Sequence, residues 1–381
     1  MLSLQPTLRL GRDVWDRAAM PADEFHHRAD RLRAAMTRDG LDALLLYGSN
    51  LNGCGHPTYL ANYIVKLPFA ALVVLPRDGE PALMFQGATR GRSAAQATTW
   101  IEDVRPCWNM AETCLAVLAE RGLTRARLGL AAMPRLVPHA DWQTLVAGLA
   151  GATLVDAEDL VNRERAIKSD RELAQIRRAS EIVHRALDSV ARPFQDRERG
   201  AVGHARAADE SSLAADVIHD ARMHGAEDIR LMIARPRDAA WAFRPVEDRP
   251  LRDGETVTLL VAASWERYWS EATRTFVVSA HRIDPVWPAD LDARFRALAS
   301  ALQPGLTIAD WTRAALDTLT PVEANAIAPY GLGHGIGITP EEQPLLSTAD
   351  PSAIARGMCL AVRVAFESDN GVVLHGDTIV A

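Results

Sequence analysis

Charged and imidazole side chains that could move protons gather in the last third of the sequence. Glu271 lies in the segment Ser-Glu-Ala-Thr-Arg-Thr-Phe, His334 stands between two glycines, and Arg363 interrupts the apolar segment 359–366. An unpaired guanidinium is costly to bury, so Arg363 must face a carboxylate or a cavity. A carboxylate and an imidazole beside that cation could have pKa values suited to proton transfer at neutral pH.

Further carboxylates and an imidazole extend this candidate site. Glu341 and Glu342 lie in a turn that ends at Pro344, and His375 lies in the closing apolar segment. Arg363 is predicted to bind substrate, because the planar fork of an arginine suits a carboxylate. Glu342 is a further candidate, as a substrate-binding residue or a base. Four residues are predicted to be catalytic. The carboxylate of Glu271 or Glu341 would be the base, and the imidazole of His334 or His375 would be the acid or a hydrogen-bond donor.

Each of these residues also has a structural interpretation. Glu271 could pair with Arg274 or Arg363 in a salt bridge between strands. His334 could belong to a turn whose glycines let the backbone approach another group closely. His375 and the two glutamates of the turn could be ordinary structural or surface residues.

Aromatic and polar residues outside these segments are further binding candidates. Trp241 and Tyr268 flank the site-bearing segments and could enclose a cationic or planar substrate, with core packing as the alternative. His56 and Tyr59 lie in a polar, glycine-rich loop after an apolar segment, where binding residues often occur. A plain connecting loop is the alternative for this pair.

Composition and charge limit the class of protein. The chain has 381 residues, 48% hydrophobic and 24% charged, which is typical of a globular protein long enough for two domains. Its 42 Lys and Arg against 49 Asp and Glu give a net charge of −7 with no basic run, which argues against nucleic acid as a partner. Its four cysteines form no CxxC pair, and no apolar run suggests a signal peptide or a membrane span. We therefore expect a cytoplasmic protein.

Hydrophobic patterning predicts that helices and strands alternate in the first 160 residues, as in an α/β domain. Asp78 and Gly79 predict the turn between two of the strands. The predicted elements are helices at 24–40, 110–121 and 139–149 and strands at 41–47, 69–75, 81–85 and 127–131.

A charged helical stretch from residue 161 onward indicates a second domain. Ser169 and Glu172 fit a capping box at the start of a helix with a buried stripe. The elements predicted after it are helices at 211–224, 290–302 and 308–319 and strands at 229–234, 256–263, 275–279, 358–366 and 372–380. We predict two domains, 1–160 and 161–381, of the α/β (α+β) class.

Five segments of the second half, in the same order, resemble the pita-bread family of creatinase, prolidase, aminopeptidase P and methionine aminopeptidase. The segment 270–276 is similar to the family strand S-D-x-T-R-T-F, and the segment 333–337 matches its G-H-G-I-G turn. The others are the helix entry at 165–173, Gly357-Met358 and Asp377-Thr378. The resemblance implies a creatinase-like N-terminal α/β domain followed by a pita-bread domain.

The resemblance also locates the metal ligands of the family's peptidases, in which two Asp, one His and two Glu hold two divalent ions. These positions fall on Leu260, Glu271, His334, Arg363 and Gly376. In a slipped register, the last of them falls on His375 instead of Gly376. A guanidinium cannot ligate a metal and stays protonated, so Arg363 would put a fixed positive charge where the family binds a dication. We therefore expect no metal and no other cofactor.

Two mechanistic histidines of the family are replaced as well. One falls on Ala242, beside Trp241, and the other falls on Glu341. Creatinase hydrolyses a C–N bond without a metal, and in creatinase-like dimers the N-terminal domain of one subunit lends residues to the other subunit's pocket. By this resemblance His56 and Tyr59 are substrate-binding candidates of a homodimer.

The sequence therefore predicts a homodimeric, metal-independent hydrolase or lyase. It would act on a C–N bond of a small amino-acid-like or amidino substrate that bears a carboxylate, with no nucleic acid or membrane as a partner. In this mechanism Arg363 binds the carboxylate and His334 protonates the leaving group. A second hypothesis is an Xaa-Pro-type metallopeptidase that holds one ion with Glu271, His334, His375 and Glu367. A third is a non-catalytic binding protein of the same fold.

Overall fold

The computed structural model describes residues 15–50, 53, 55–65, 69–191, 209–235, 243–279, 283–287, 289–369 and 371–381. Trp241 and Ala242 lie outside the described residues, so the predicted place of Trp241 in the pocket stays a prediction. Internal contacts divide the chain between Arg165 and Ala166 into an N-terminal and a C-terminal unit. The division falls later than the predicted boundary at 160, because Glu164 bonds Arg31 and Arg165 bonds His56 inside the first unit.

The N-terminal unit is built on a mixed sheet with the strand order β4-β3-β2-β1-β5-β6. Strands β1 to β3 pair antiparallel, whereas β4, β5 and β6 join in parallel. Its elements are α1 (Ala22–Asp39), β1 (Ala43–Ser49), α2 (Gly55–Ala61), β2 (Ala70–Pro76), β3 (Ala82–Gln86), α3 (Arg92–Thr98), β4 (Asp103–Cys107), α4 (Met110–Glu120), β5 (Arg127–Ala131), α5 (Met133–Leu136), α6 (His139–Gly148), β6 (Thr153–Asp156) and α7 (Glu158–Ala166).

Burial explains the central place of β1 and β2 in that sheet. Every residue of both strands is buried, which requires neighbours on both edges and cover on both faces. Cys114 and Val117 of α4 and Leu145 of α6 pack in the apolar cluster against these strands. The predicted alternation of helices and strands is therefore present, with α2, α3, α5, β4 and β6 in addition to the predicted elements.

The C-terminal unit is built on an antiparallel sheet with the order β12-β11-β13-β14-β9-β8-β7, and β10 pairs with β9. The capping box of Ser169 and Glu172 is present and begins α8. The elements are α8 (Asp170–Asp188), α10 (Glu210–Met223), β7 (Ile229–Ala234), β8 (Thr256–Trp265), β9 (Tyr268–Val278), β10 (Ile283–Pro285), α11 (Ala289–Ser300), α12 (Ile308–Asp317), α13 (Pro321–Ile327), β11 (Gly333–Gly335), β12 (Glu342–Leu345), β13 (Cys359–Ser368) and β14 (Gly371–Val380).

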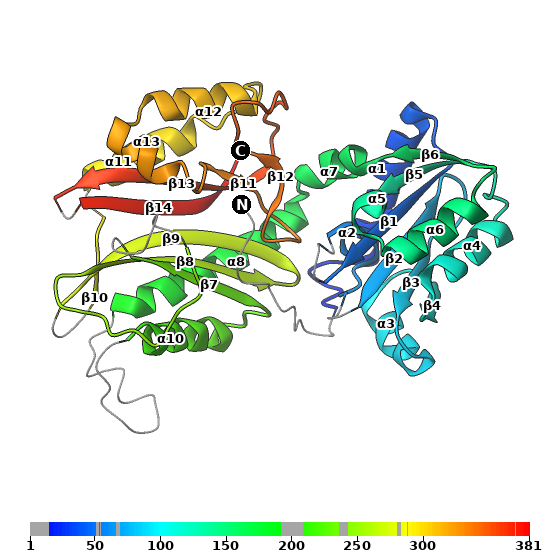
Figure 1. Cartoon of the computed structure of the whole chain (residues 1–381), viewed down its shortest axis with the longest axis horizontal. Helices are drawn as coiled ribbons and strands as arrows, with labels where there is room; N and C mark the ends of the chain where they lie inside the picture. Colours follow the sequence, from blue (N-terminus) through cyan, green and yellow to red (C-terminus); the bar gives the residue numbers. More distant parts are fainter. Residues whose placement is uncertain are drawn as a thin grey trace. The chain divides into compact units, whose positions relative to one another are not determined.

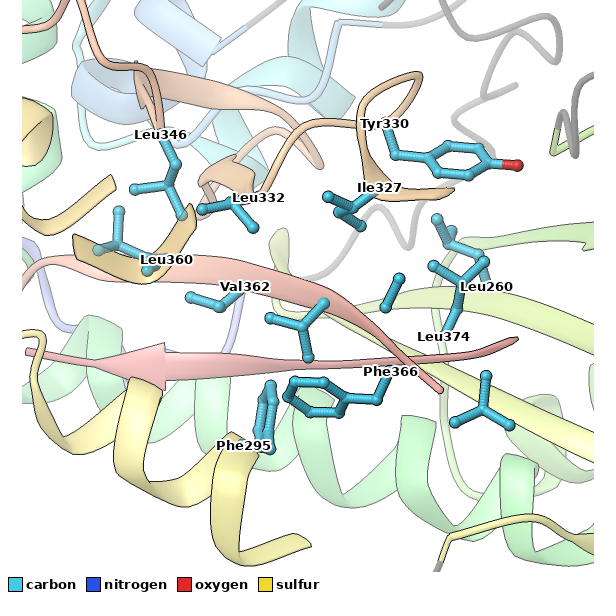
Figure 2. Close-up of a cluster of buried hydrophobic side chains, with 14 of the residues drawn as sticks. Leu260, Phe295, Ile327, Tyr330, Leu332, Leu346, Leu360, Val362, Phe366 and Leu374 are labelled. Carbon is cyan, nitrogen blue, oxygen red and sulfur yellow. The ribbon is translucent and has the colours of Figure 1, made fainter. Parts of the chain in front are cut away.

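Helices cover one face of this sheet, which we call the outer face. In Figure 1, α8 and α10 lie along β7, β8 and β9, and α11, α12 and α13 lie along β13 and β14. Phe295 of α11 packs near Phe366 of β13 in the apolar cluster drawn in Figure 2. The opposite face of the sheet, the inner face, carries the candidate site.

Polar residues on the inner face explain why the sequence pattern predicted only the last part of strand β9. Strand β9 begins at Tyr268, whereas the sequence pattern predicted a strand only from Thr275. Glu271 and Thr273 interrupt the apolar pattern, and the sheet places both on the inner face, in the candidate site. Among the described helices, none combines the length and apolar character that crossing a bilayer would require.

Candidate functional site

A first cross-strand row brings predicted site residues to the inner face. Arg230 of β7 pairs with Ala262 of β8, and Ala262 pairs with Glu271 of β9. Directly paired residues of antiparallel strands point to the same face, so all three share the inner face. Farther along the sheet, His334 of β11 pairs with Ala361 of β13.

A second row, displaced by two residues along the strands, carries three of the family's ligand positions. Leu260 pairs with Thr273, Thr273 with Gly376, and Gly376 with Arg363. A Cβ at Gly376 would lie 2.9 Å from the Cβ of Arg363 and 2.8 Å from the carbonyl oxygen of Val362. The absence of a side chain at Gly376 therefore makes room for Arg363.

Arg363 joins the two rows. Its Nη2 atom lies 2.9 Å from Oε1 of Glu271 and 2.9 Å from Nε2 of His334. The Arg363 and Glu271 side chains are only 8% and 3% exposed, so this ion pair is buried. The structure thus bears out the salt bridge that the sequence left open for Glu271, and it places both retained ligand positions against one guanidinium.

His334 is a neutral acceptor in this arrangement. Because a guanidinium only donates, Nε2 of His334 accepts from Arg363, and Nδ1 donates to the carbonyl oxygen of Gly335 at 2.9 Å. Burial and the nearby Arg363 lower the pKa of His334, outweighing the opposite effect of Glu271. Both ring nitrogens of His334 have protein partners in this arrangement, and its role as the acid that protonates a leaving group stays a prediction.

Glu341 forms a second ion pair at the edge of the same cluster. Its Oε1 atom lies 2.8 Å from Nη1 of Arg230, and its side chain is 39% exposed. Burial alone would raise the pKa of Glu341, but the hydrogen bond from Arg230 and the charge of Arg363 hold the pKa below its usual value. Glu341 thus lies near the site as predicted, but it is a weak base.

Glu342 forms structural contacts, and its predicted part in substrate binding stays a prediction. Its carboxylate forms a buried ion pair with Lys168 at 3.1 Å and accepts a hydrogen bond from the backbone of Thr339 at 3.0 Å. These contacts fasten the turn after the G-H-G-I-G segment to the residue that precedes α8. Both carboxylate oxygens of Glu342 have protein partners.

Tyr268 also lies away from the predicted pocket. Its hydroxyl donates to Oε1 of Glu172 in α8 at 3.0 Å. Tyr268 is three residues before Glu271 in the same strand, and side chains alternate between the faces of a strand, so the two point to opposite faces. The core-packing alternative describes Tyr268 better.

His375 lies on the outer face, which contradicts its predicted catalytic role. It pairs with Val364, the neighbour of Arg363, and therefore points away from Arg363 and Glu271. Its ring stacks on Trp287 with centroids 3.7 Å apart, and Phe295 packs against its other side. Burial, followed by the charge of Arg274, lowers the pKa of His375 to about 3.

This buried imidazole predicts loss of stability in mild acid. A histidine whose pKa is lowered on folding contributes stability that is complete above its unfolded pKa of about 6.5 and is lost as the pH falls towards the folded value. We expect the unfolding midpoint in urea to fall between about pH 6.5 and 5, above the range in which most carboxylates titrate. His375→Phe, which keeps the stacking on Trp287, should reduce that fall, whereas His219→Gln on the exposed face of α10 should not. An unchanged pH dependence in His375→Phe would show that another group is responsible.

His56 and Tyr59 are buried in the N-terminal unit. Nδ1 of His56 lies 3.1 Å from Nη1 of Arg165, and the Tyr59 hydroxyl donates to the carbonyl oxygen of Glu164 at 3.4 Å. The guanidinium of Arg28 lies over the Tyr59 ring. These contacts fasten the end of α7 within the unit, and a role of either residue in substrate binding stays a prediction.

The residues at the positions that the resemblance assigns to the family's metal ligands lack the donors that a two-metal centre would need. Leu260 is buried in the apolar cluster (Figure 2), whereas Gly376 has no side chain and Arg363 is a cation. The two remaining donors, Glu271 and His334, both contact that cation. Among the described residues, no group of three or more His, Cys, Asp or Glu side chains is arranged to hold a metal ion.

Arg230 and Thr273 are residues of the candidate site that were not predicted from the sequence. Arg230 lies in the apolar strand Ile229–Ala234, just as Arg363 lies in an apolar segment, and the same argument about buried guanidinium groups could have identified it. Thr273 carries no comparable signal, because threonine is common in strands. Its place in the site follows only from its pairing with Leu260 and Gly376.

Two cavities among the described residues do not coincide with these rows. One of about 620 Å³ is lined by surface residues of the N-terminal unit, including Arg77 and Arg121. Another of about 330 Å³ lies on the outer face beside His184 and Arg274. Neither is lined by Arg230, Glu271 or Arg363, and we locate the candidate site from the buried charges instead.

Comparisons with known proteins agree with the predicted order of the domains. Residues 28–167 match the creatinase/prolidase N-terminal domain, and residues 174–381 match metallopeptidase family M24. An Xaa-Pro dipeptidase of Pyrococcus horikoshii is 27% identical over 217 residues, which cover 54% of this chain and 56% of that protein. The chain thus spans just over half the length of some curated relatives that it matches.

Two further comparisons extend over nearly the whole chain. A probable dipeptidase PepE of Mycobacterium bovis is 24% identical over 359 residues, or 89% of this chain and 87% of that protein. The structure of dipeptidase PepE from Mycobacterium ulcerans superposes with a TM-score of 0.69 at 20% identity, covering 97% of this chain and 94% of that one. At this identity the superposition shows the fold alone.

Proposed function

The chain belongs to metallopeptidase family M24, and from this premise we propose that it hydrolyses a C–N bond of a small, carboxylate-bearing compound without the two-metal centre of the family's peptidases. The class of compound is amino-acid-like or amidino. The observation that carries the proposal is the guanidinium of Arg363 between the two retained ligand positions, 2.9 Å from Glu271 and 2.9 Å from His334. The peptidase names of the relatives support C–N hydrolysis, but they do not support metal independence.

In the proposed reaction Glu271 is first the base and then the acid. One carboxylate oxygen, Oε1, accepts from Arg363, whereas Oε2 is buried and has no partner among the described residues. Oε2 takes a proton from water, the water oxygen attacks the carbon of the scissile bond, and the C–N bond breaks. The proton on Glu271 then passes to the departing nitrogen, so the carboxylate is regenerated.

Arg363 and His334 have binding and positioning roles in this scheme. The Nε atom of Arg363 is an unused buried donor among the described residues, and it is available to a substrate carboxylate. The neutral ring of His334 accepts from Nη2 and holds the guanidinium in place. A lyase reaction at the same groups would begin with proton abstraction by Glu271 from carbon instead of water.

Glu271→Gln tests the proposal. We expect it to fold, because an amide oxygen can still accept from Arg363, and to lose nearly all turnover, because an amide cannot take the proton from water. The measurement is release of amine from Gly-Pro, creatine and N-carbamoylglycine, with and without a chelator. Chelator-resistant turnover by the wild-type protein that Glu271→Gln removes is the expected result. Unchanged turnover in Glu271→Gln would refute the assignment.

The second candidate is an Xaa-Pro-type metallopeptidase with a rearranged single-metal site. The names of the relatives favour it over the metal-independent hypothesis. Its predicted ligands do not converge, however, because His375 lies on the outer face and Glu367 accepts from Thr320 at 2.8 Å. Turnover of Gly-Pro that depends on added manganese, iron or zinc and is abolished by a chelator would favour this candidate over the first.

We further propose that the protein works as a cytoplasmic homodimer. The dimer rests on the resemblance to creatinase, and free Cys107, Cys114 and Cys359 are consistent with a reducing compartment. The net charge of −7 supports small molecules over nucleic acid as partners. Light scattering after size-exclusion chromatography measures the oligomeric state, and a monomer across micromolar concentrations would exclude the dimer.

A further inference from the structure

Four buried polar atoms on the inner face lack a hydrogen-bond partner among the described residues. They are Nε of Arg230, Nε of Arg363, Oε2 of Glu271 and Oγ1 of Thr273. Buried polar groups in folded proteins are normally hydrogen-bonded, because leaving one unpaired costs free energy. A cluster of such atoms on one face therefore indicates a place for a bound molecule.

Arg235 is a buried arginine of the C-terminal unit whose Nε atom does have a hydrogen-bond partner. Its Nε atom donates to Glu255 at 3.0 Å, and its Nη1 atom donates to Glu210 at 2.8 Å. Its Nη2 atom donates to the carbonyl oxygen of Pro250 at 3.3 Å. Arg235 follows β7 directly, and its Nε has a partner, whereas the Nε of Arg230 in that strand has none among the described residues.

The register places Glu271 between the two arginines. Arg230 is two strands away from Glu271, with only the methyl group of Ala262 between them, and neighbouring strands are about 4.8 Å apart. Arg363 approaches Glu271 from the other side. Nη1 of Arg230 is held by Glu341 at 2.8 Å, which leaves Nε for another acceptor.

The charges of this cluster balance. Arg230 and Arg363 are permanently positive, Glu271 and Glu341 supply two carboxylates, and the burial of His334 favours its neutral form. A ligand with a net charge would leave an uncompensated charge in a buried site. A zwitterion would keep the site neutral and could still satisfy donors and acceptors separately.

We propose that Arg230 is a second substrate-binding residue, and that the ligand is a small zwitterion whose carboxylate accepts from both arginines while its N–H group donates to Glu271. The proposal deepens the function proposed above and rests on it for the location of the site. It adds a residue of β7 to the binding groups and sets the charge of the substrate.

Equilibrium binding tests the proposal without requiring turnover. Guanidinoacetate and Gly-Pro are zwitterionic probes, and acetate and methylguanidinium carry one charge each. We expect both zwitterions to raise the thermal unfolding midpoint of the wild-type protein at concentrations where acetate and methylguanidinium do not. Failure of both zwitterions to bind the wild-type protein, or equal binding of acetate, would overturn the proposal.

Arg230→Lys separates the unused donor from the charge. Lysine can keep the ion pair with Glu341 but has no second N–H aimed from the Nε position, so the variant should fold and bind each zwitterion about tenfold or more weakly. Arg178→Lys, at an exposed position of α8, is the matched control and should bind as the wild type does. If Arg230→Lys does not fold, Arg230→Met is measured in the same way. Wild-type affinity in either folded variant would refute the role of Arg230.

The binding and turnover results separate the two proposals. Zwitterion binding that depends on Arg230, without turnover of any probe, would leave the inference standing and refute the hydrolase. Turnover that depends on Glu271, with a KM that is unchanged in Arg230→Lys, would support the hydrolase and refute the role of Arg230 in substrate binding.

Discussion

Arg363→Met should destabilise the C-terminal unit by roughly 3–5 kcal/mol, the usual result when one member of a buried ion pair is removed. The reason is the carboxylate of Glu271, whose side chain is 3% exposed and would be left without a counter-charge. Nε2 of His334 would lose its donor as well. The measurement is the free energy of unfolding from urea titrations at neutral pH.

A double-mutant cycle separates this effect from the loss of packing. Glu271→Leu combined with Arg363→Met removes both charges, so the double variant should be more stable than Arg363→Met alone. Such recovery requires that the two side chains interact directly, as their 2.9 Å contact indicates. Strictly additive losses, or an Arg363→Met variant as stable as the wild type, would mean that Arg363 does not pair with Glu271 inside the protein.

Arg363→Glu should give the protein a divalent metal site. Glutamate is shorter than arginine, and a metal–oxygen bond of about 2.0–2.2 Å would put the ion close to the position that Nη2 now occupies. That position is 2.9 Å from both Glu271 and His334, so a contraction of the site would complete a set of two carboxylates and an imidazole. Without metal the two carboxylates repel each other, and the variant should be less stable than the wild type.

Metal should reverse that destabilisation. At about a hundredfold excess over the dissociation constant, a ligand that binds only the folded state contributes about 2.7 kcal/mol. We expect manganese or zinc to raise the unfolding midpoint of Arg363→Glu but not that of the wild type or of Arg363→Gln, the neutral control of similar size. A midpoint of Arg363→Glu that does not respond to either metal would contradict the geometry proposed for the site.

The sequence was sufficient to predict the fold and the convergence of Glu271, His334 and Arg363, because both depend on local patterns and motifs. The capping box at Ser169 and the strand Ile229–Ala234 follow directly from the order of residue types. Glu271, His334 and Arg363 were placed together because their segments resemble a family in which the same positions converge. The comparisons confirm the family and the order of its domains.

The sequence did not predict as well to which face of the sheet each side chain points. A shift of one residue along a strand moves a side chain to the opposite face, and the sequence left Gly376 and His375 as alternatives for one position. Pairing of Gly376 with Arg363 resolves the register and puts His375 on the outer face. The face to which Tyr268 points could not be predicted for a related reason, because polar residues interrupt the apolar pattern of β9 and hide that the strand begins at Tyr268.

Residues whose role depends on a distant partner gave the least signal. Glu342 resembles a surface glutamate in the sequence, yet it forms a buried ion pair with Lys168, 174 residues away in the chain. Arg230 similarly meets Glu341 only after β7 and the turn before β12 are brought together. Local patterns do not encode such pairings, because tertiary packing creates them.

The metal content of the wild-type protein tests most directly whether Arg363 occupies the place of the family's ions. The protein would be produced with added manganese, iron and zinc, dialysed against metal-free buffer, and measured by elemental analysis. We predict that no divalent ion is retained in a stoichiometric amount, because Glu271 and His334 are both bound to the guanidinium. A stoichiometric ion that is lost in Glu271→Gln would contradict this account and favour the metallopeptidase.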